Sequence, residues 1–381
     1  MARVRLIICG LLIVLITLSL RVLFTDRDTA PPVHENDLAG VLGDSAGYAQ
    51  ADRARRFRFP ADFGAHPDFR QEWWYFTGNL QAADGRRFGY ELTLFRIALS
   101  PNQTPGRSAW RTDQLYTAHL ALTDRQEHRF ECYERFSRGA MGLAGARTAP
   151  FRVWLEDWRV AARPGGGFPW RLEANAGNWR LALALSPQKP LVLQGNRGLD
   201  RKSAKGHASY YYSFTRLSTV GTLTLDGEII DLNGLSWLDR EWSSGSLADD
   251  QQGWDWFALQ LNDGADIMFY RLRDTRDATD PNSGGVWVDA LGNSVTLVAS
   301  DVRIETLAHW SSPRGGRYPA RWRLTIPACD CRLIVTPIMA DQELDVLVRY
   351  WEGAVDVTGL CGTDRVSGMG YVELTGYAER T

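Results

Sequence analysis

Short runs of alternating residues that end at turn signals constrain the fold of this chain more than any other feature. The run "TVGTLTLDG" turns at Asp226-Gly227 into "EIIDL", and "EWWYFTGNL" turns at "AADG" into "RFGYELTLFRIAL". An Asp-Gly pair between two alternating runs is the strongest short-range signal of a β-hairpin. Helical periodicity is scarce after residue 56. We therefore expect an all-β protein, an antiparallel barrel or sandwich.

The composition fits an aromatic-rich β-protein. Of 381 residues, 44% are hydrophobic and 23% are charged, and the net charge of −2 gives no reason to expect nucleic-acid binding. The 15 tryptophans are unusual. They suit a β core, and they equally suit a pocket for a long apolar ligand, so composition alone does not separate these interpretations.

An internal repeat indicates that the body of the chain consists of two similar halves. Residues Trp73 to Arg96 and Trp254 to Arg273 both contain an aromatic cluster, a strand, an Asp-Gly turn and a second strand that ends on arginine. Chance similarity of two hairpins is one explanation. Duplication of a barrel domain explains the pattern better and puts the join near residue 245. The alignment places Trp74 of the first copy against Asp255 of the second.

The stretch "GWDWF" places an acid between two tryptophans at the start of a predicted strand. Alternate residues of a strand share a face, so Asp255 shares the apolar face with Phe257 and Leu261. If that face lines a barrel, Asp255 points inward, away from Trp254 and Trp256. The acid is then either half of a salt bridge or a proton donor held in an aromatic pocket.

A second cluster, "GLSWLDREWSSGSL", combines charges with tryptophans. It supplies Trp237, Asp239, Arg240, Glu241 and Trp242. One interpretation is a structural ion pair that joins the two barrels. The other is a pocket wall that holds Asp255. The six histidines form no close metal-ligand pair, and no metal site is expected.

The first 24 residues predict a membrane segment. The uncharged run Leu6 to Leu20 spans about 22 Å as a helix, and it approaches the hydrocarbon thickness only when it is extended to Phe24. No small-x-small cleavage site follows, so we favour an uncleaved anchor over a signal peptide, with the body on the extracytoplasmic side. Residues 25–56 are predicted to be a polar tether, 57–245 the first domain and 246–381 the second.

The five cysteines allow one disulfide bond. Cys329 and Cys331 are two apart in a predicted strand and point to opposite faces, so they are not expected to pair with each other. One of them could pair with Cys361. No common zinc-binding spacing is present.

Four motifs give the chain a family resemblance. "HPDFRQEWWYFTGNL", "GYELTLFR", "WLDREWS" and "GWDWFALQL" resemble those of the AttH-like, carotenoid 1,2-hydratase-like proteins, which are often labelled predicted secreted hydrolases. The resemblance runs from about Phe59 to near the C-terminus. It implies two consecutive lipocalin-like β-barrels, export from the cytoplasm, and an ABC-type exporter as a partner. The hydratases add water to an alkene without a cofactor, so none is expected.

The hydratase chemistry suits these residues on physical grounds. A carboxyl buried among aromatics has a raised pKa, and aromatic faces stabilise the carbocation that protonation of an alkene leaves. We therefore predict Asp255 as the general acid, with Asp239, Arg240 and Glu241 as further catalytic candidates. The predicted ligand-binding residues are Trp73, Trp74, Tyr75, Trp237, Trp242, Trp254, Trp256 and Phe257.

One departure from the family pattern bears on the activity. Many members carry histidine at the position of Arg240, and a permanent cation beside Asp255 would hold that acid ionised. Two function classes therefore remain open. The first, which we favour, is a carrier of a hydrophobic, lipid-like or isoprenoid-like ligand. The second is a hydratase, or less plausibly a hydrolase, that acts on an apolar substrate.

Overall fold

The computed structural model describes residues 45–102, 108–245, 247–248 and 250–378. These residues form β-strands and three short 3-10 helices, η1 (Ala61–Phe63), η2 (Ala299–Asp301) and η3 (Pro327–Cys329). The all-β prediction is confirmed for this part of the chain. Within it, no helix has the length and apolar character needed to cross a bilayer. The predicted membrane segment lies outside the described residues.

The first sheet runs from β1 to β13. Its hydrogen-bonded order is β4-β3-β2-β1-β13-β12-β9-β8-β7-β6-β5, and β10 and β11 pair with β12. The strands are β1 (Gln71–Ala82), β2 (Arg87–Ala98), β3 (Gln114–Asp124), β4 (Arg129–Arg138), β5 (Ala144–Thr148), β6 (Phe151–Leu155), β7 (Trp158–Ala162), β8 (Trp170–Ala176), β9 (Trp179–Pro187), β10 (Val192–Leu193), β11 (Leu199–Arg201), β12 (Ala208–Leu225) and β13 (Glu228–Ser243).

The second sheet begins after a break between residues 243 and 251. Its order is β17-β16-β15-β14-β23-β22-β20-β19-β18, and β21 pairs with β22. The strands are β14 (Gln251–Leu261), β15 (Asp266–Asp274), β16 (Gly284–Val288), β17 (Ser294–Val298), β18 (Arg303–Ser311), β19 (Arg317–Ile326), β20 (Cys331–Pro337), β21 (Glu343–Leu344), β22 (Tyr350–Cys361) and β23 (Asp364–Leu374).

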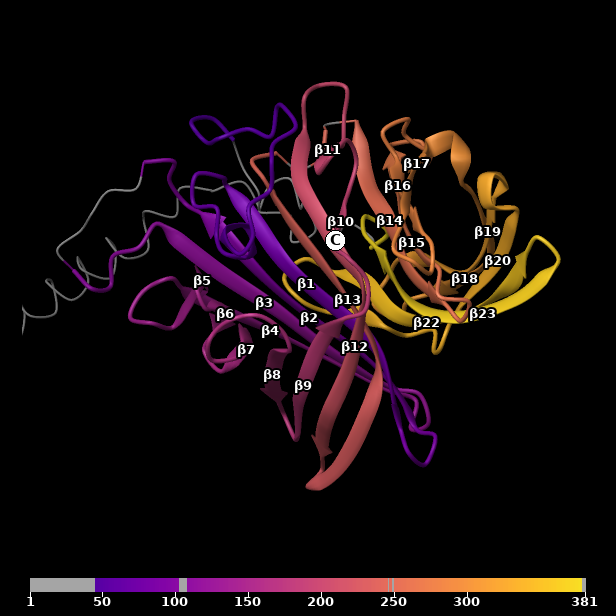
Figure 1. Ribbon diagram of the computed structural model, residues 1–381, viewed down its shortest axis with the longest axis horizontal. Helices are drawn as coiled ribbons and strands as arrows, with labels where there is room; N and C mark the ends of the chain where they lie inside the picture. Colours follow the sequence, from indigo (N-terminus) through magenta and orange to yellow (C-terminus); the bar gives the residue numbers. More distant parts are fainter. Residues whose placement is uncertain (1–44, 103–107, 246, 249, 379–381) are drawn as a thin grey trace, which may run out of the picture.

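The two halves of the repeat occupy equivalent places in their sheets. The hairpin β1–β2 opens the first sheet and β14–β15 opens the second, and each opening strand also pairs with the last strand of its own sheet, β13 or β23. Each sheet curls around its own apolar core (Figure 1). Trp74 belongs to the first core, and Phe257 and Leu261 belong to the second. The predicted inward face of "GWDWFALQL" is therefore present.

Neither curled sheet is sealed by a continuous hydrogen-bond ladder, so the closed barrels predicted from the sequence are open at one seam. The edge strands of the first sheet, β4 and β5, do not pair with each other. Side chains close the seam instead. The Arg135 guanidinium on β4 lies 4.2 Å from the Trp158 ring and also pairs with Asp157.

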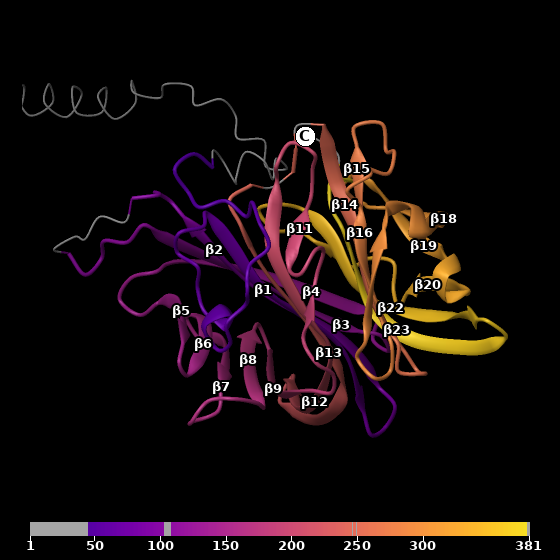
Figure 2. The ribbon, with the colours of Figure 1, turned by 45° about the horizontal axis from the view of Figure 1, so that its top comes forward.

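The two barrels pack against each other through a third apolar cluster. Figures 1 and 2 show the strands of the first sheet lying beside the orange and yellow strands of the second. Tyr75 and Trp256 meet edge to face with ring centroids 5.0 Å apart, and Trp237 packs on the same indole at 6.3 Å. Gly89 permits the close approach, since a Cβ at this position would lie 2.6 Å from the Ala354 Cβ.

The last part of the predicted tether lies against the first barrel. Residues 45–56 pack on the first barrel, where Tyr48 and Ala51 are buried and the Tyr48 hydroxyl donates to the Ala98 carbonyl at 2.8 Å. An aromatic ring and a methyl group within a polar stretch are enough to anchor the segment. The rest of the predicted tether lies outside the described residues.

A disulfide bond joins Cys331 on β20 to Cys361 on β22, and Cys329 is free. The sequence left open whether Cys361 pairs with one of the two neighbouring cysteines, and the structure shows that it pairs with Cys331. Cys331 and Cys361 are directly opposite in the ladder between β20 and β22, which brings their side chains to one face.

We expect removal of this disulfide to destabilise the second barrel. The bond closes a loop with a sequence separation of 30 residues. Loop-closure entropy then predicts that Cys361→Ala lowers the free energy of unfolding by about 3 to 4 kcal/mol. Urea unfolding of the oxidised protein and the variant measures the difference. Cys329→Ser is the matched control, and an equal loss in that variant would contradict the assignment.

Candidate active site

A cavity of about 300 Å³ lies where the two barrels meet. Strands β1, β2, β3, β4, β12 and β13 form one side, and β14, β15, β22 and β23 form the other. Most of its lining is apolar. The aromatic side chains are Trp73, Tyr75, Phe95, Phe136, Tyr211, Trp254, Trp256, Tyr270 and Tyr350. Such a volume and lining suit a small apolar ligand.

Asp239 and Glu241 form the first acidic wall of the cavity. In "LDREW" on β13, alternation turns these two acids toward the second barrel and turns Arg240 and Trp242 into the first. Asp239 Oδ1 accepts hydrogen bonds from the Ser213 hydroxyl at 2.5 Å and the Trp237 indole N–H at 2.7 Å. The Tyr211 hydroxyl donates to the other oxygen.

The donors around Asp239 limit the effect of its burial. Burial raises the pKa of Asp239 to about 6, against hydrogen bonds that lower it. Burial also raises the pKa of Glu241 to about 7, although Lys202 opposes the rise. The Lys202 ammonium lies 2.5 Å from Asp200 and 3.7 Å from Glu241. Asp239 is therefore the more readily ionised acid of this wall at neutral pH.

Glu352 and Glu373 form the second acidic wall. They are directly opposite each other in the ladder between β22 and β23. The Tyr75 hydroxyl donates to Glu352, and the Trp254 indole N–H donates to Glu373 at 3.1 Å. Burial raises the pKa of Glu373 to about 8. Burial, followed by repulsion from Glu91 and Glu373, raises the pKa of Glu352 well above its ordinary value.

The two walls act on each other across the cavity. The charges of Asp239 and Glu241 add to the rise in the pKa of Glu373. Burial thus raises the pKa of Glu373 above that of Asp239, so near neutral pH Glu373 is the better proton donor of the two and Asp239 the better acceptor. One apolar cavity therefore holds a proton donor and a proton acceptor, the arrangement that assigns acid and base roles to paired carboxyls.

The structure gathers six of the twelve predicted site residues on the cavity. They are Trp73, Tyr75, Asp239, Glu241, Trp254 and Trp256. Trp237 is not among the residues that line the cavity, but its indole N–H donates a hydrogen bond to Asp239, which does line it. Trp74 and Trp242 belong to the core of the first barrel, and Phe257 belongs to that of the second. These three are therefore core residues, because strand alternation turns them away from the interface.

Arg240 pairs with Glu72, not with Asp255. Its guanidinium is fully buried, donates to the Gly64 carbonyl at 2.7 Å and lies 3.9 Å from the Trp74 ring. Glu72 also pairs with Arg96. Burial alone would raise the pKa of Glu72, but the two guanidinium groups hold it well below its usual range. Arg240 thus compensates the buried charge of Glu72 in the first barrel.

Asp255 lies inside the second barrel, outside the cavity. Its carboxylate is 3.0 Å from the Arg273 guanidinium and 3.3 Å from that of Arg271, and it accepts a hydrogen bond from the Tyr377 hydroxyl at 2.8 Å. Burial raises the pKa of Asp255, and both arginines oppose that rise. Asp255 is therefore part of a salt bridge, as one of the two sequence interpretations held. Its partners are Arg273 and Arg271 and not Arg240.

The sequence reasoning missed the second acidic wall. Glu352 and Glu373 occur in "YWEGAV" and "YVELT", each as an acid within a short stretch that has no other charged residue. That pattern is the same signal that singled out Asp255. It was available in the sequence, but only the pairing of β22 with β23 brings the two acids together.

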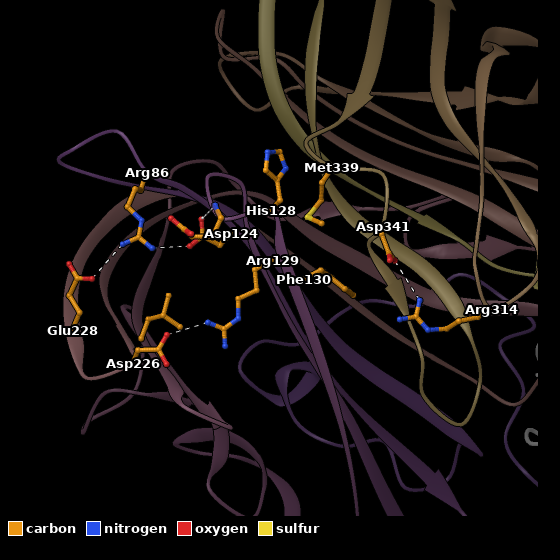
Figure 3. Close-up of a pocket in the computed structure, with 12 residues that line it drawn as sticks. Arg86, Asp124, His128, Arg129, Phe130, Asp226, Glu228, Arg314, Met339 and Asp341 are labelled. Carbon is orange, nitrogen blue, oxygen red and sulfur yellow. Dashed lines mark hydrogen bonds and ion pairs between the residues drawn. The ribbon is translucent and has the colours of Figure 1, made fainter.

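A larger surface depression of about 850 Å³ lies elsewhere and is a poorer candidate. Figure 3 shows that its charged side chains are paired with one another. Arg86 pairs with Asp124 at 2.9 Å, and Arg129 pairs with Asp226 at 3.3 Å. Charges that satisfy each other at the surface leave little for a ligand to bind. Among the described residues, no group of three histidine, cysteine or acidic side chains is placed to hold a metal ion.

Comparisons with known proteins agree with this architecture. A family described as AttH-like matches residues 50–377. The chain belongs to the AttH-like family. A proposed AttH from Nitrosomonas europaea is 36% identical, with a TM-score of 0.77, over 87% of this chain and 100% of the other. The AttH-like family resemblance inferred from the tryptophan motifs is thus confirmed.

The fold extends to more distant proteins. Kievitone hydratase from Nectria haematococca superimposes with a TM-score of 0.64 at 16% identity, over 88% of this AttH-like chain and 97% of the hydratase. At that identity the similarity concerns the fold alone. No curated protein matches the chain.

We expect Glu373→Gln to make this AttH-like protein more stable at alkaline pH. Glu373 ionises near its ordinary value of 4.5 when unfolded and near 8 when folded. Between these values the folded state holds a proton that the unfolded state releases, so this acid reduces stability as pH rises. Glutamine removes the cost, which reaches roughly 5 kcal/mol above pH 8.

Urea unfolding across this pH window measures the effect. The gain should be largest at the alkaline end and vanish toward pH 4.5, where both states are protonated. Glu305→Gln, at an exposed position on β18, is the matched control and should show no such trend. A gain independent of pH would contradict the raised pKa.

Proposed function

We propose that this protein is a cofactor-independent hydratase that adds water to a carbon–carbon double bond of an apolar substrate held between the two barrels. The observation that carries the proposal is the pair of unequal carboxyls, Glu373 and Asp239, on opposite walls of one largely apolar cavity. A carboxyl that stays protonated at neutral pH can donate to carbon, and an ionised one can accept a proton from water.

The reaction follows from this placement. The Glu373 carboxyl gives its proton to one alkene carbon, and the electron pair of the double bond forms the new C–H bond. The positive charge on the other carbon lies among Trp254, Trp256 and Tyr75, whose ring faces attract cations. A water molecule adds to that carbon, and Asp239 accepts the proton it releases. The sum on the substrate is addition of one water, and the enzyme returns to its starting state when Asp239 releases a proton and Glu373 takes one up.

Two observations support the type of reaction. The fold is similar to that of kievitone hydratase, an enzyme named for water addition. The cavity is lined mainly by aromatic and aliphatic side chains, which favours an isoprenoid-like or other apolar alkene over a polar substrate. In this proposal Glu373 takes the proton-donor role that the sequence suggested for Asp255, because Asp255 faces the interior of the second barrel.

The second candidate is a carrier for a hydrophobic ligand on the extracytoplasmic side. The apolar cavity would serve a carrier equally well. The disulfide between Cys331 and Cys361 supports an oxidising compartment. In this version the N-terminal segment anchors the protein to the membrane, and an ABC-type exporter delivers or receives the ligand.

We expect the purified protein to hydrate at least one member of a panel of apolar alkenes, beginning with an acyclic carotenoid. In ¹⁸O-labelled water the product gains the label, which mass spectrometry detects. Loss of the proton donor or acceptor, in Glu373→Gln or Asp239→Asn, should lower the rate by about 100-fold or more. The rate should fall as pH rises through about 8 and as pH falls through about 6.

Asp255→Asn separates this proposal from the one made from the sequence. Its position inside the second barrel predicts activity that follows the folded fraction, measured by circular dichroism. Full loss of turnover in a folded Asp255→Asn protein, with activity kept in Glu373→Gln, would assign the acid to Asp255. No turnover by the wild type across the panel would reject the hydratase.

Ligand extraction distinguishes the carrier from the enzyme. We expect a hydrophobic molecule to co-purify with the full-length protein, and Trp256→Ala to lose it because this indole lines the cavity. Mass spectrometry of the extract gives the mass of the co-purified molecule. A carrier returns the same mass after incubation with wild type or with Glu373→Gln. An enzyme returns a hydrated mass from the wild type only.

A further inference from the structure

Glu352, one of the two acids of the second wall, lacks direct access to solvent. The Glu352 side chain is fully buried, and its partner across the ladder, Glu373, faces the apolar cavity. In each turnover of the proposed hydratase, Glu373 gives one proton to the substrate and Asp239 takes one from the added water. Before the next substrate, Glu373 must regain a proton and Asp239 must release one.

A line of hydrogen-bonding groups leads from Glu352 toward the surface. Tyr350 is two residues away on β22, so the two side chains share a face. The Tyr350 hydroxyl lies 2.8 Å from Nδ1 of His119, and Nε2 of His119 lies 3.1 Å from Glu134. The side chain of Glu134 is 17% exposed, whereas that of His119 is only 8% exposed.

The inner end of this line is ready to accept a proton. Oε2 of Glu352 is buried and receives no well-aligned hydrogen bond. The Tyr350 hydroxyl is a neighbouring donor to this carboxyl and favours its ionised form. Tyr75 occupies Oε1, the other oxygen. Oε1 of Glu352 therefore accepts a hydrogen bond from Tyr75, and Oε2 is the oxygen left to accept a proton from Tyr350.

The line crosses between the barrels. His119 on β3 and Glu134 on β4 belong to the first sheet, and Tyr350 and Glu352 on β22 belong to the second. The Phe95 ring packs against His119 with centroids 5.2 Å apart, and the backbone N–H of Leu347 donates to Glu134 at 3.1 Å. These contacts place His119 and Glu134 at the interface between the two barrels.

We propose that Glu134, His119 and Tyr350 form a proton relay that recharges the Glu352–Glu373 pair from solvent. The relay rests on the proposed hydratase function. His119 and Tyr350 act through Glu352 and are positioning residues, because neither is required to touch the reacting carbons.

Each transfer conserves protons. Ionised Glu352 accepts the phenolic proton of Tyr350 as the Tyr350 oxygen takes the proton from Nδ1 of His119. Nε2 of His119 takes a proton from the Glu134 carboxyl, which takes one from water. The imidazole is left as its other tautomer, and rotation of the ring restores it. One proton has then moved from solvent to Glu352, and its transfer to Glu373, the residue directly opposite in the ladder, restores the proton donor.

The charged and titratable groups around the relay come from several strands. Those that face Glu352 are Tyr75 on β1, Glu91 on β2, Tyr350 on β22, and Tyr371 and Glu373 on β23. Those that face His119 are Glu134 and Tyr350. No guanidinium or ammonium group pairs with Glu352 among the described residues. An ionised Glu352 is thus readily reprotonated.

Exchange of the Glu352 proton tests the relay without any substrate. The full-length protein is mixed with D₂O, and the C=O stretching band of the protonated carboxyl is followed by infrared spectroscopy. Glu352→Gln identifies the band. We expect fast exchange in the wild type and exchange slower by about tenfold or more in His119→Phe and in Tyr350→Phe. Free imidazole should restore the rate in His119→Ala, because His119 lines the cavity.

The controls separate the relay from folding and from catalysis. His309→Phe, which removes an exposed histidine on β18, should leave the exchange rate unchanged. Tyr350→Phe removes one hydroxyl only, so it keeps the test valid if His119→Phe fails to fold. Equal exchange in wild type, His119→Phe and Tyr350→Phe overturns the relay. Slow exchange in the variants of a protein that hydrates nothing would keep the relay and reject the hydratase.

Discussion

The contact between the two barrels is the interaction on which the candidate site depends. Tyr75, Trp237, Trp256 and Tyr371 bury their rings in one cluster between the sheets. Edge-to-face pairs of this kind contribute about 0.5–1.5 kcal/mol each beyond the area they bury. The same contact brings the Asp239 wall of one barrel opposite the Glu373 wall of the other. Neither barrel alone supplies both acidic walls of the cavity.

The chain uses buried acids in two different ways. At the ends of the barrels, Glu72 and Asp255 lie against arginines that compensate their charge. In the cavity, Glu352 and Glu373 lie against aromatic rings and each other. The first arrangement stabilises the fold, because removing either partner would leave a buried charge. The second costs stability and is explained by a function that needs a proton at neutral pH.

The repeat extends to the ion pairs. Arg96 and Arg273 end the second strand of each copy, and each pairs with an acid of the first strand, Glu72 or Asp255. In the alignment the two acids are offset by two residues, which keeps both on the inward face of their strands. The arginine that follows Asp239 joins the first of these pairs, through Glu72. Arg240 is thus a structural residue of the first barrel.

The sequence by itself determined the strands, their inward and outward faces, the two-barrel family and the acid-rich cluster on β13. These features depend on residues close together in the chain, where a period of two and an Asp-Gly turn act directly. Only the tertiary structure decided which acid meets which cation. Asp255 and Arg240 are near in sequence, yet their strands belong to different sheets and their side chains enter different cores. Glu373 became a candidate because strand pairing and barrel packing join residues more than a hundred positions apart, a relation that no local pattern records.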